Sequence, residues 1–293
     1  MSTRIGSWRC LCSHSKIIGG IKLFRELNNT VKNESTTLRH LKWSIIISGL
    51  VFMLLGTSDI FSQELSEGMN NQPTADAISK GKELYDVTCA YCHGLDGKGD
   101  GPAADFLIPA PRDFSEGVYK FRHTPSGSIP SDRDLYESIT KGIHGTSMIR
   151  WRELPEKQRW WLVHYIKTFS DKFLDEKNPP VITVSEPPRL TRESIRSGRQ
   201  FYIDAECWKC HGESGRGDGP SANELKDKDG NISIPRDLTI GKNYGRGSSR
   251  KAIYITLISG LDGTPMPSYQ DAFEDMDEEL WNLVNYIYSL TEE

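Results

Sequence analysis

Two five-residue segments constrain this chain of 293 residues more than any other feature of its sequence. Residues 89–93 read CAYCH and residues 207–211 read CWKCH, so the pattern C-x-x-C-H occurs twice. This pattern is the attachment signature of c-type haem, in which two thiols bind the porphyrin and the following histidine reaches the iron as an axial ligand. We therefore predict two covalently attached haem c groups. The predicted attachment residues are Cys89, Cys92, Cys207 and Cys210, and the predicted iron ligands are His93 and His211.

Two other uses of these cysteines are open on the sequence alone. Each C-x-x-C pair can close a structural disulfide, or the four thiols can form a zinc site. The distance between the pairs, and the histidine after each, count against zinc. The chain has six cysteines, and the remaining two, Cys10 and Cys12, lie in a segment that we expect to be removed.

The motifs belong to a longer internal repeat, which is the signature of duplicated structural units. Most matching residues differ by 118 positions, including the glycines of the loop that follows each motif. The triplets 111–113 and 235–237 both read PRD and differ by 124, because the second copy inserts about six residues around 226–231. The offset then returns to 118 for Met148 and Met266, each of which follows its motif histidine by 55 residues.

The repeated methionines are the predicted second axial ligands. Each lies in a Gly-Thr-x-Met segment, and iron held by His and Met has both axial positions filled. Such an iron transfers electrons with little rearrangement and binds substrate poorly, which favours an electron carrier over an enzyme. The alternatives are that Met148 and Met266 are core residues, or that His144 replaces Met148. Ile149 stands where the second copy has Pro267, so the match is weaker in the first half.

Two further repeated residues are predicted to support each haem pocket. Pro102 and Pro220 can present backbone carbonyls to the free ring nitrogens of the motif histidines, which would fix the tautomer of each ring. Arg112 and Arg236 can pair with haem propionates, because bidentate Arg–carboxylate contacts suit desolvated charges. The alternatives are ordinary turn prolines and local Arg–Asp surface pairs. His123 and His164 have no counterparts in the second half, and we interpret them as surface and helix-face histidines.

A helical framework surrounds these residues. An opening helix before each motif carries Gly81 and Tyr85 in the first half, and Gly198 and Tyr202 in the second. Glycine and tyrosine four positions apart share one helix face, and the glycine marks a close crossing with another helix. The expected partners are aromatic-rich amphipathic helices at 159–166 and 280–287. No strand alternation of any length appears, so we predict an all-α fold of two tandem domains, each wrapped around one haem.

The predicted organisation begins with a presequence at 1–62. Its apolar run 43–56 follows basic residues, is short for a membrane span, and fits the h-region of a signal peptide. The predicted domains are 75–175 and 191–293, joined by a proline-rich, semi-rigid linker at 176–190. We expect an exported protein that is soluble in the periplasm or an equivalent compartment. An uncleaved anchor reaching across 43–61 is the alternative, and is the one case in which we expect membrane attachment.

Charge limits the partners. Residues 1–62 hold eight Lys/Arg and three Asp/Glu, which leaves a net charge of −9 on residues 63–293. This balance argues against nucleic acid and favours redox proteins with a basic docking patch.

The motifs together resemble class I cytochrome c, and in particular dihaem proteins made of two such domains in tandem. The likeness covers roughly 75–175 and 190–293. Within the first half, segments 111–114 (PRDF), 119–122 (YKFR), 124–127 (TPSG) and 145–148 (GTSM) are similar to those of dihaem cytochromes associated with respiratory molybdenum enzymes such as nitrite oxidoreductases. The resemblance implies covalent haem and electron transfer between a redox enzyme and the respiratory chain.

Three rival functions are weighed against a free carrier. Dihaem thiosulfate dehydrogenases use an additional cysteine as haem ligand, and no cysteine after Cys12 lies outside the motifs. Dihaem peroxidases need an iron that opens to peroxide, which matching methionines in both halves disfavour. A permanently bound electron-transfer subunit of a larger oxidoreductase complex is the third. We predict a non-enzymatic electron carrier.

Overall fold

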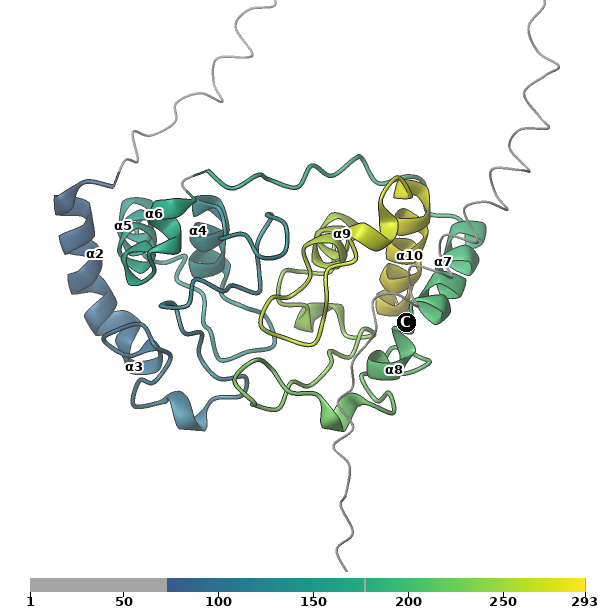
Figure 1. Cartoon of the computed structure of the whole chain (residues 1–293), viewed down its shortest axis with the longest axis horizontal. Coiled ribbons are helices and arrows are strands. Elements are labelled where there is room, and N and C mark those ends of the chain that lie inside the picture. Colours follow the sequence, from purple (N-terminus) through teal and green to yellow (C-terminus); the bar gives the residue numbers. More distant parts are fainter. Residues whose placement is uncertain (1–72, 177, 293) are drawn as a thin grey trace, which may run out of the picture. The chain divides into compact units, whose positions relative to one another are not determined.

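The computed structural model of the chain describes residues 73–176 and 178–292 (Figure 1). These residues form helices and irregular segments without a β-strand, apart from an isolated antiparallel bridge between Lys226 and Ile232. The predicted all-α fold is confirmed. No helix in this part of the chain has the length and apolar character needed to cross a membrane. The predicted presequence 1–62, with its apolar run 43–56, lies outside the described residues.

The same order of helices occurs twice along the chain. Each half has a long opening helix, a four-residue helix over its C-x-x-C-H motif, a middle helix and a closing helix, with short 3-10 turns between them. The first half contains α2 (Ala75–Thr88), α3 (Ala90–His93), η1 (Ala104–Phe106), α4 (Asp132–Lys141), α5 (Glu156–Ile166), η2 (Lys167–Phe169) and α6 (Lys172–Asp175). The second half contains α7 (Arg192–Asp204), α8 (Trp208–His211), η3 (Ala222–Glu224), η4 (Gly241–Asn243), α9 (Arg250–Ser259), η5 (Asp271–Phe273), α10 (Asp277–Ser289) and η6 (Leu290–Glu292).

The opening and closing helices of each half cross at the predicted glycine. A Cβ atom at Gly81 would lie 2.2 Å from the carbonyl oxygen of Trp161 in α5, and one at Gly198 would lie 1.8 Å from that of Asn282 in α10. Real Cβ atoms do not approach this closely, so only glycine allows the two backbones to meet. One turn further on, the tyrosine of the opening helix packs edge-on against a tyrosine of the closing helix in both halves. The predicted crossing is confirmed.

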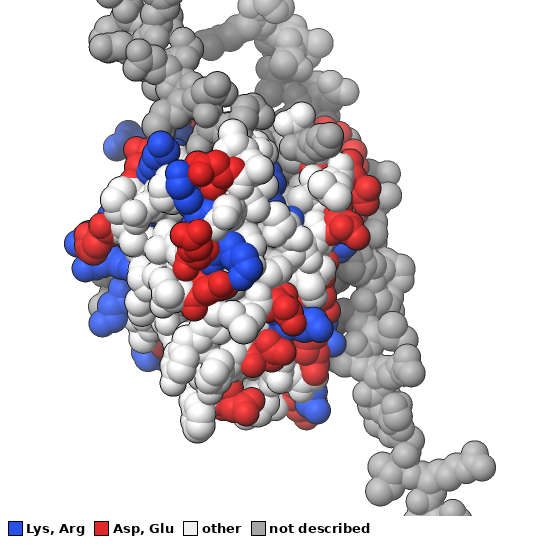
Figure 2. All heavy atoms as spheres, turned by 90° about the vertical axis from the view of Figure 1, so that its left-hand side faces the viewer, with Lys and Arg blue, Asp and Glu red and all other residues white. Residues whose placement is uncertain are grey.

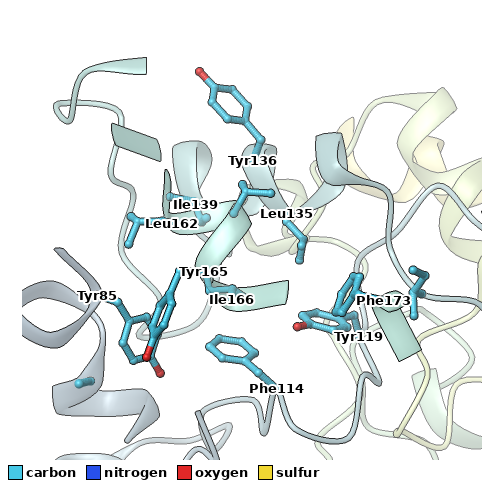
Figure 3. Packing of buried hydrophobic residues seen from close by; sticks show 13 residues of the cluster. Tyr85, Phe114, Tyr119, Leu135, Tyr136, Ile139, Leu162, Tyr165, Ile166 and Phe173 are labelled. Carbon is cyan, nitrogen blue, oxygen red and sulfur yellow. The ribbon is translucent and has the colours of Figure 1, made fainter. Parts of the chain in front are cut away.

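The core of the first half continues from this crossing to the motif helix (Figure 3). Tyr85, Leu162 and Ile166 are at most 5% exposed, and each contributes about 1.5–3 kcal/mol by burial. The same cluster includes Ala90 of α3 and Phe114, whose ring stacks on that of His93 at a centroid distance of 4.4 Å. Packing of the helices therefore also fixes the position of the first candidate haem ligand.

Buried charges join the two halves. The guanidinium of Arg122 is fully buried, donates to the carbonyl oxygen of Ser259 at 2.7 Å, and forms an ion pair with Asp262 at 2.7 Å. The carboxylate of Asp262 also accepts hydrogen bonds from the Ser126 hydroxyl and the Gly127 amide. Removing one partner from such a pair is costly, so these contacts hold the two halves in one arrangement.

The described residues of the connection between α6 and α7, which exclude residue 177, contain no helix (Figure 1). The amide of Ile182 donates to the carbonyl of His123 in the first half, and the hydroxyl of Ser185 accepts from Trp281 in α10. The connection therefore contacts both halves, and its semi-rigid character stays a prediction. The exact domain boundaries, 75–175, 176–190 and 191–293, stay predictions.

Candidate haem sites

Both C-x-x-C-H motifs fold in the same way. The helices α3 and α8 begin directly after the first cysteine of each motif. A buried tyrosine of the opening helix donates a hydrogen bond to the carbonyl directly after each motif, from Tyr85 to Gly94 at 2.8 Å and from Tyr202 to Gly212 at 2.7 Å. The crossing of the long helices thus fixes both the start and the end of the motif.

Among the described residues, none of the four motif cysteines forms a disulfide. Burial raises the pKa of Cys89 to about 11 and that of Cys207 to about 12, so both thiols are protonated at neutral pH. Within the described residues, no group of three or more His, Cys, Asp or Glu side chains is arranged to hold a metal ion. The described structure therefore gives no support to the disulfide or the zinc interpretation of the motifs.

A cavity of about 340 Å³ lies beside α3 in the first half. Its lining is mainly apolar and contains Cys89, Cys92 and His93 of the motif together with Met148. A concave apolar site with a few polar groups suits a large, mostly apolar cofactor. The structure thus gathers the predicted first-haem residues around one cavity.

The ring nitrogen Nδ1 of each motif histidine contacts an arginine carbonyl. His93 Nδ1 lies 3.1 Å from the carbonyl oxygen of Arg112, and His211 Nδ1 lies 3.0 Å from that of Arg236. A carbonyl can only accept, so Nδ1 carries the proton and Nε2 is free to bind a metal. This geometry corrects the sequence prediction that gave the accepting role to Pro102 and Pro220.

Both prolines lie in a loop whose amides bond to the end of the motif helix. Amides of the loop 97–103 donate to the carbonyls at the end of α3, from Gly99 to His93, from Gly101 to Cys92, and from Ala103 to Tyr91. These bonds satisfy carbonyls at the end of the helix that have no partner within it. Pro102 is exposed, and Pro220 is exposed in the same loop of the second half. The sequence predicted a role for the side chains of Arg112 and Arg236. It did not predict that their backbone carbonyls accept from the motif histidines.

Burial tunes both histidines for metal binding. It lowers the pKa of His93, with a smaller effect in the same direction from the Arg112 guanidinium, and it lowers the pKa of His211. A neutral imidazole is the form that binds a metal, so desolvation favours the ligating state at neutral pH.

The Met148 and Met266 turns have matching hydrogen bonds. In the first, the Ile143 amide donates to the Met148 carbonyl at 3.0 Å, and the Met148 amide donates to the Thr146 hydroxyl at 3.1 Å. The second turn repeats them at 3.1 and 3.2 Å, with Leu261 and Thr264 in the corresponding places. Both methionines are half-buried. Their role as iron ligands stays a prediction.

His144, the rival to Met148, lies elsewhere. It is exposed and lines a separate, smaller cavity of about 60 Å³ with His123, Asp134 and Arg246. Ile149, although 62% exposed, lines the same cavity as Met148 and His93. The placement favours Met148 over His144.

Polar groups on the first cavity match the carboxylates of a haem. The Tyr119 side chain is 8% exposed, and its hydroxyl has no partner among the described residues. Arg112 and Lys120 line the same cavity. Burial and the nearby guanidiniums of Arg112 and Arg236 lower the pKa of Lys120 to about 8. An unpartnered buried donor and two desolvated cations are the groups that bound propionates would satisfy, so this cavity fits haem.

Two histidines differ from the sequence interpretation. His164 was interpreted as a surface or helix-face residue, but it is 3% exposed, and its Nδ1 has no partner among the described residues. It corresponds to Asn285 of α10, which is fully buried and bonded to Ser194. His123 is only partly exposed, and its ring pairs with the buried Asp134. Because both closing helices bury this face, a polar residue there does not indicate exposure.

Comparison with known families matches each half separately. Residues 76–166 match the family described as cytochrome c oxidase, cbb3-type, subunit III, and residues 195–291 match the family described as cytochrome c. No curated protein matches the chain.

A solved structure extends the match over both halves. The chain is similar to a chain of the reducing HAO-like protein complex of Kuenenia stuttgartiensis, with 42% identity and a TM-score of 0.69. The match covers 75% of this chain and 97% of that one.

Fold, motifs and comparisons therefore define a c-type cytochrome with two domains in tandem. The chain belongs to the cytochrome c family and carries two covalently bound haem c groups, one in each domain.

Proposed function

We propose that this cytochrome is a two-haem carrier of single electrons, with no catalytic reaction of its own. The observation that supports the proposal most directly is the repetition of one arrangement, in which a neutral motif histidine and a methionine turn occur in both domains. The bound haem supplies one-electron redox chemistry. The protein's part is to attach it, close both axial positions and exclude water.

We assign the ligands as the sequence predicts. Cys89 and Cys92 attach the first haem, and Cys207 and Cys210 attach the second. His93 and Met148 would hold the iron in the first domain, and His211 and Met266 would hold it in the second. One imidazole nitrogen and one thioether sulfur on each iron would leave no coordination position for a substrate.

We assign the propionate contacts on each side to one arginine. Arg112 acts in the first domain, with support from Lys120 and the Tyr119 hydroxyl, and Arg236 acts in the second. Burial lowers the pKa of both arginines. A haem propionate paired with each guanidinium would offset the cost of burying its charge.

We further propose that the protein acts outside the cytoplasm, between a redox enzyme and the respiratory chain. The net charge of −9 on residues 63–293 supports a partner with a basic docking patch. On the face drawn in Figure 2, acidic and basic side chains are interspersed. Attraction is therefore expected from the summed field of the chain rather than from that face, and association should slow as ionic strength rises.

A permanently bound subunit of an oxidoreductase complex is the second candidate. It is favoured by the likeness to a chain of a complex of two proteins in Kuenenia stuttgartiensis. Purification of the native protein distinguishes the two proposals. A carrier is expected to elute alone, whereas a subunit elutes with its partner at both low and high salt.

Carbon monoxide binding to the reduced holoprotein tests the carrier proposal. If both axial positions are closed, carbon monoxide should not change the visible spectrum of either haem. A redox titration should then show two reversible one-electron transitions. Stoichiometric carbon monoxide binding at one haem would instead indicate an open iron and an enzymatic site.

A further inference from the structure

Arg236 makes two contacts that lead to different haem sites. Its backbone carbonyl accepts a hydrogen bond from His211 Nδ1 at 3.0 Å, on the proximal side of the second site. Its guanidinium Nη1 donates to the carbonyl oxygen of Gly145 at 2.9 Å. Gly145 opens the turn that ends at Met148, so the side chain of Arg236 reaches the distal side of the first site.

Arg112 occupies the corresponding place in the first domain. Its carbonyl accepts from His93 Nδ1 at 3.1 Å, and its side chain, which lines the first cavity, also approaches the other domain. The Nη1 atom of Arg112 would lie 3.2 Å from a Cβ atom at Gly263, the residue that opens the turn of Met266. The arrangement is therefore reciprocal, with a hydrogen bond in one direction and a packing contact in the other.

We propose that Arg112 and Arg236 are reciprocal positioning residues, each of which joins the proximal-histidine loop of its own haem site to the distal-methionine turn of the other. The inference rests on the proposed function, because it takes Met148 and Met266 as the distal ligands. Its consequence is that the two sites are not independent. A disturbance on the proximal side of one haem reaches the distal ligand of the other through a single residue.

The geometry of the turns explains how this contact acts on a ligand. Inside the first turn, the Thr146 hydroxyl bonds both the Ile143 carbonyl and the Met148 amide, so the turn moves as a unit. Its outer side is held from the second domain, where Asn243 as well as Arg236 packs against Gly145. Loss of the Arg236 hydrogen bond frees that side, while the carbonyl that holds His211 is retained in any side-chain variant.

A merely local role for the arginines predicts a different pattern. If Arg236 acted only on the propionates of its own haem, its replacement would change the second site and leave the first unchanged. The decisive readout is therefore which haem responds.

The experiment uses the reduced holoprotein and the NMR signals of the two ligand methyl groups, which the haem rings displace from all others. Met148→His and Met266→His each remove one signal and so assign both. Arg236→Gln is expected to displace or broaden the Met148 signal more than the Met266 signal. Arg112→Gln is expected to act mainly on the Met266 signal, with a smaller shift because it loses a packing contact rather than a hydrogen bond.

Two control variants, and a second variant that disturbs the same contact from the glycine side, complete the experiment. Arg133→Gln removes an exposed arginine that pairs with Glu137 within α4, and it should leave both signals unchanged. Gly145→Ala places a Cβ atom 2.7 Å from Arg236 Nη1 and should also displace the Met148 signal. Gly230→Ala, at a similar positive φ but with open space around it, should not.

The outcomes separate this inference from the function on which it rests. Two methyl signals in the wild type, with Arg236→Gln changing only that of Met266 or neither, would overturn the reciprocal role and leave the carrier intact. Absence of a methyl signal in the wild type would overturn the ligation itself, and the inference with it.

Discussion

The two domains repeat what surrounds the haem and differ in what joins them to each other. The motif helix, the arginine carbonyl on the histidine and the methionine turn recur with hydrogen-bond lengths that agree within 0.1 Å. Four residues before each methionine, however, the first domain has the exposed His144, and the second has Asp262, which pairs with the buried Arg122. The two sites are therefore alike in their local hydrogen bonds, whereas the ion pair between the halves uses Asp262, which has no counterpart in the repeat.

The two domains also differ at one buried tyrosine. Tyr119 lies near Tyr85 of the first opening helix, and Tyr244 lies near Tyr202 of the second. The Tyr244 hydroxyl donates to the Leu238 carbonyl at 2.7 Å, whereas the Tyr119 hydroxyl has no partner among the described residues. The tyrosine hydroxyl is therefore available as a donor in the first site but is already used in the second, and the two haems are expected to differ in potential.

Exchanging the distal ligands breaks the similarity of the sites and has the largest expected effect. Met266→His should lower the potential of the second haem, because methionine raises haem potentials relative to a second histidine. Met148→His should do the same to the first haem. Potentiometric titration measures both transitions, and an unchanged potential in either variant would count against that methionine as ligand.

Removing Asp262 tests the difference at the interface. Asp262→Ala leaves the buried guanidinium of Arg122 without its ion-pair partner, which should cost about 3–5 kcal/mol of the free energy of unfolding. The matched variant His144→Ala, at the equivalent exposed position, should change that free energy by no more than about 0.5 kcal/mol. Denaturant unfolding of the holoprotein measures both, and similar losses would contradict the asymmetry.

The helix crossings allow a finer comparison. Gly81→Ala and Gly198→Ala should each destabilise the protein by about 1–3 kcal/mol through overpacking. The second is expected to cost more, because its Cβ atom would approach a carbonyl to 1.8 Å rather than 2.2 Å. Ser79→Ala, at an exposed position of α2, is the control in the same unfolding measurement, and equal effects of all three variants would show that the crossings are looser than described.

The smallest expected effect comes from the unpartnered hydroxyl. Tyr119→Phe removes a donor to the propionates of the first haem, worth about 0.5–1.5 kcal/mol. Because that hydrogen bond partly offsets the negative charge of a propionate, its loss should favour the oxidised iron, slightly lower the potential of the first haem and spare the second. A shift confined to the second haem would place the hydroxyl outside the first site.

Local signals made much of this structure predictable from sequence. Cys89, Cys92 and His93 constrain one another within a single turn of helix, and the Gly81–Tyr85 face predicts a close crossing from spacing alone. The 118-residue offset of Met148 and Met266 indicated equivalent turns, and the structure confirms that these turns match in their hydrogen bonds.

Residues whose role depends on distant parts of the chain were not predictable in this way. Pro102 was assigned the bond to His93, but Pro102 is exposed, and the backbone carbonyl of Arg112 contacts His93 instead. A backbone acceptor leaves no trace in side-chain identity. The contact of Arg236 with Gly145 joins residues 91 positions apart in different domains, and a repeat describes only what lies within each copy.

The far-red absorption of the oxidised holoprotein tests whether methionine binds the iron in both domains, because sulfur-to-iron charge transfer absorbs there and can be quantified per haem. A carrier with His–Met ligation in both domains predicts the intensity of two methionine-bound irons per chain. Intensity for one iron or none would contradict it, and would mean that at least one site has another ligand or an open position.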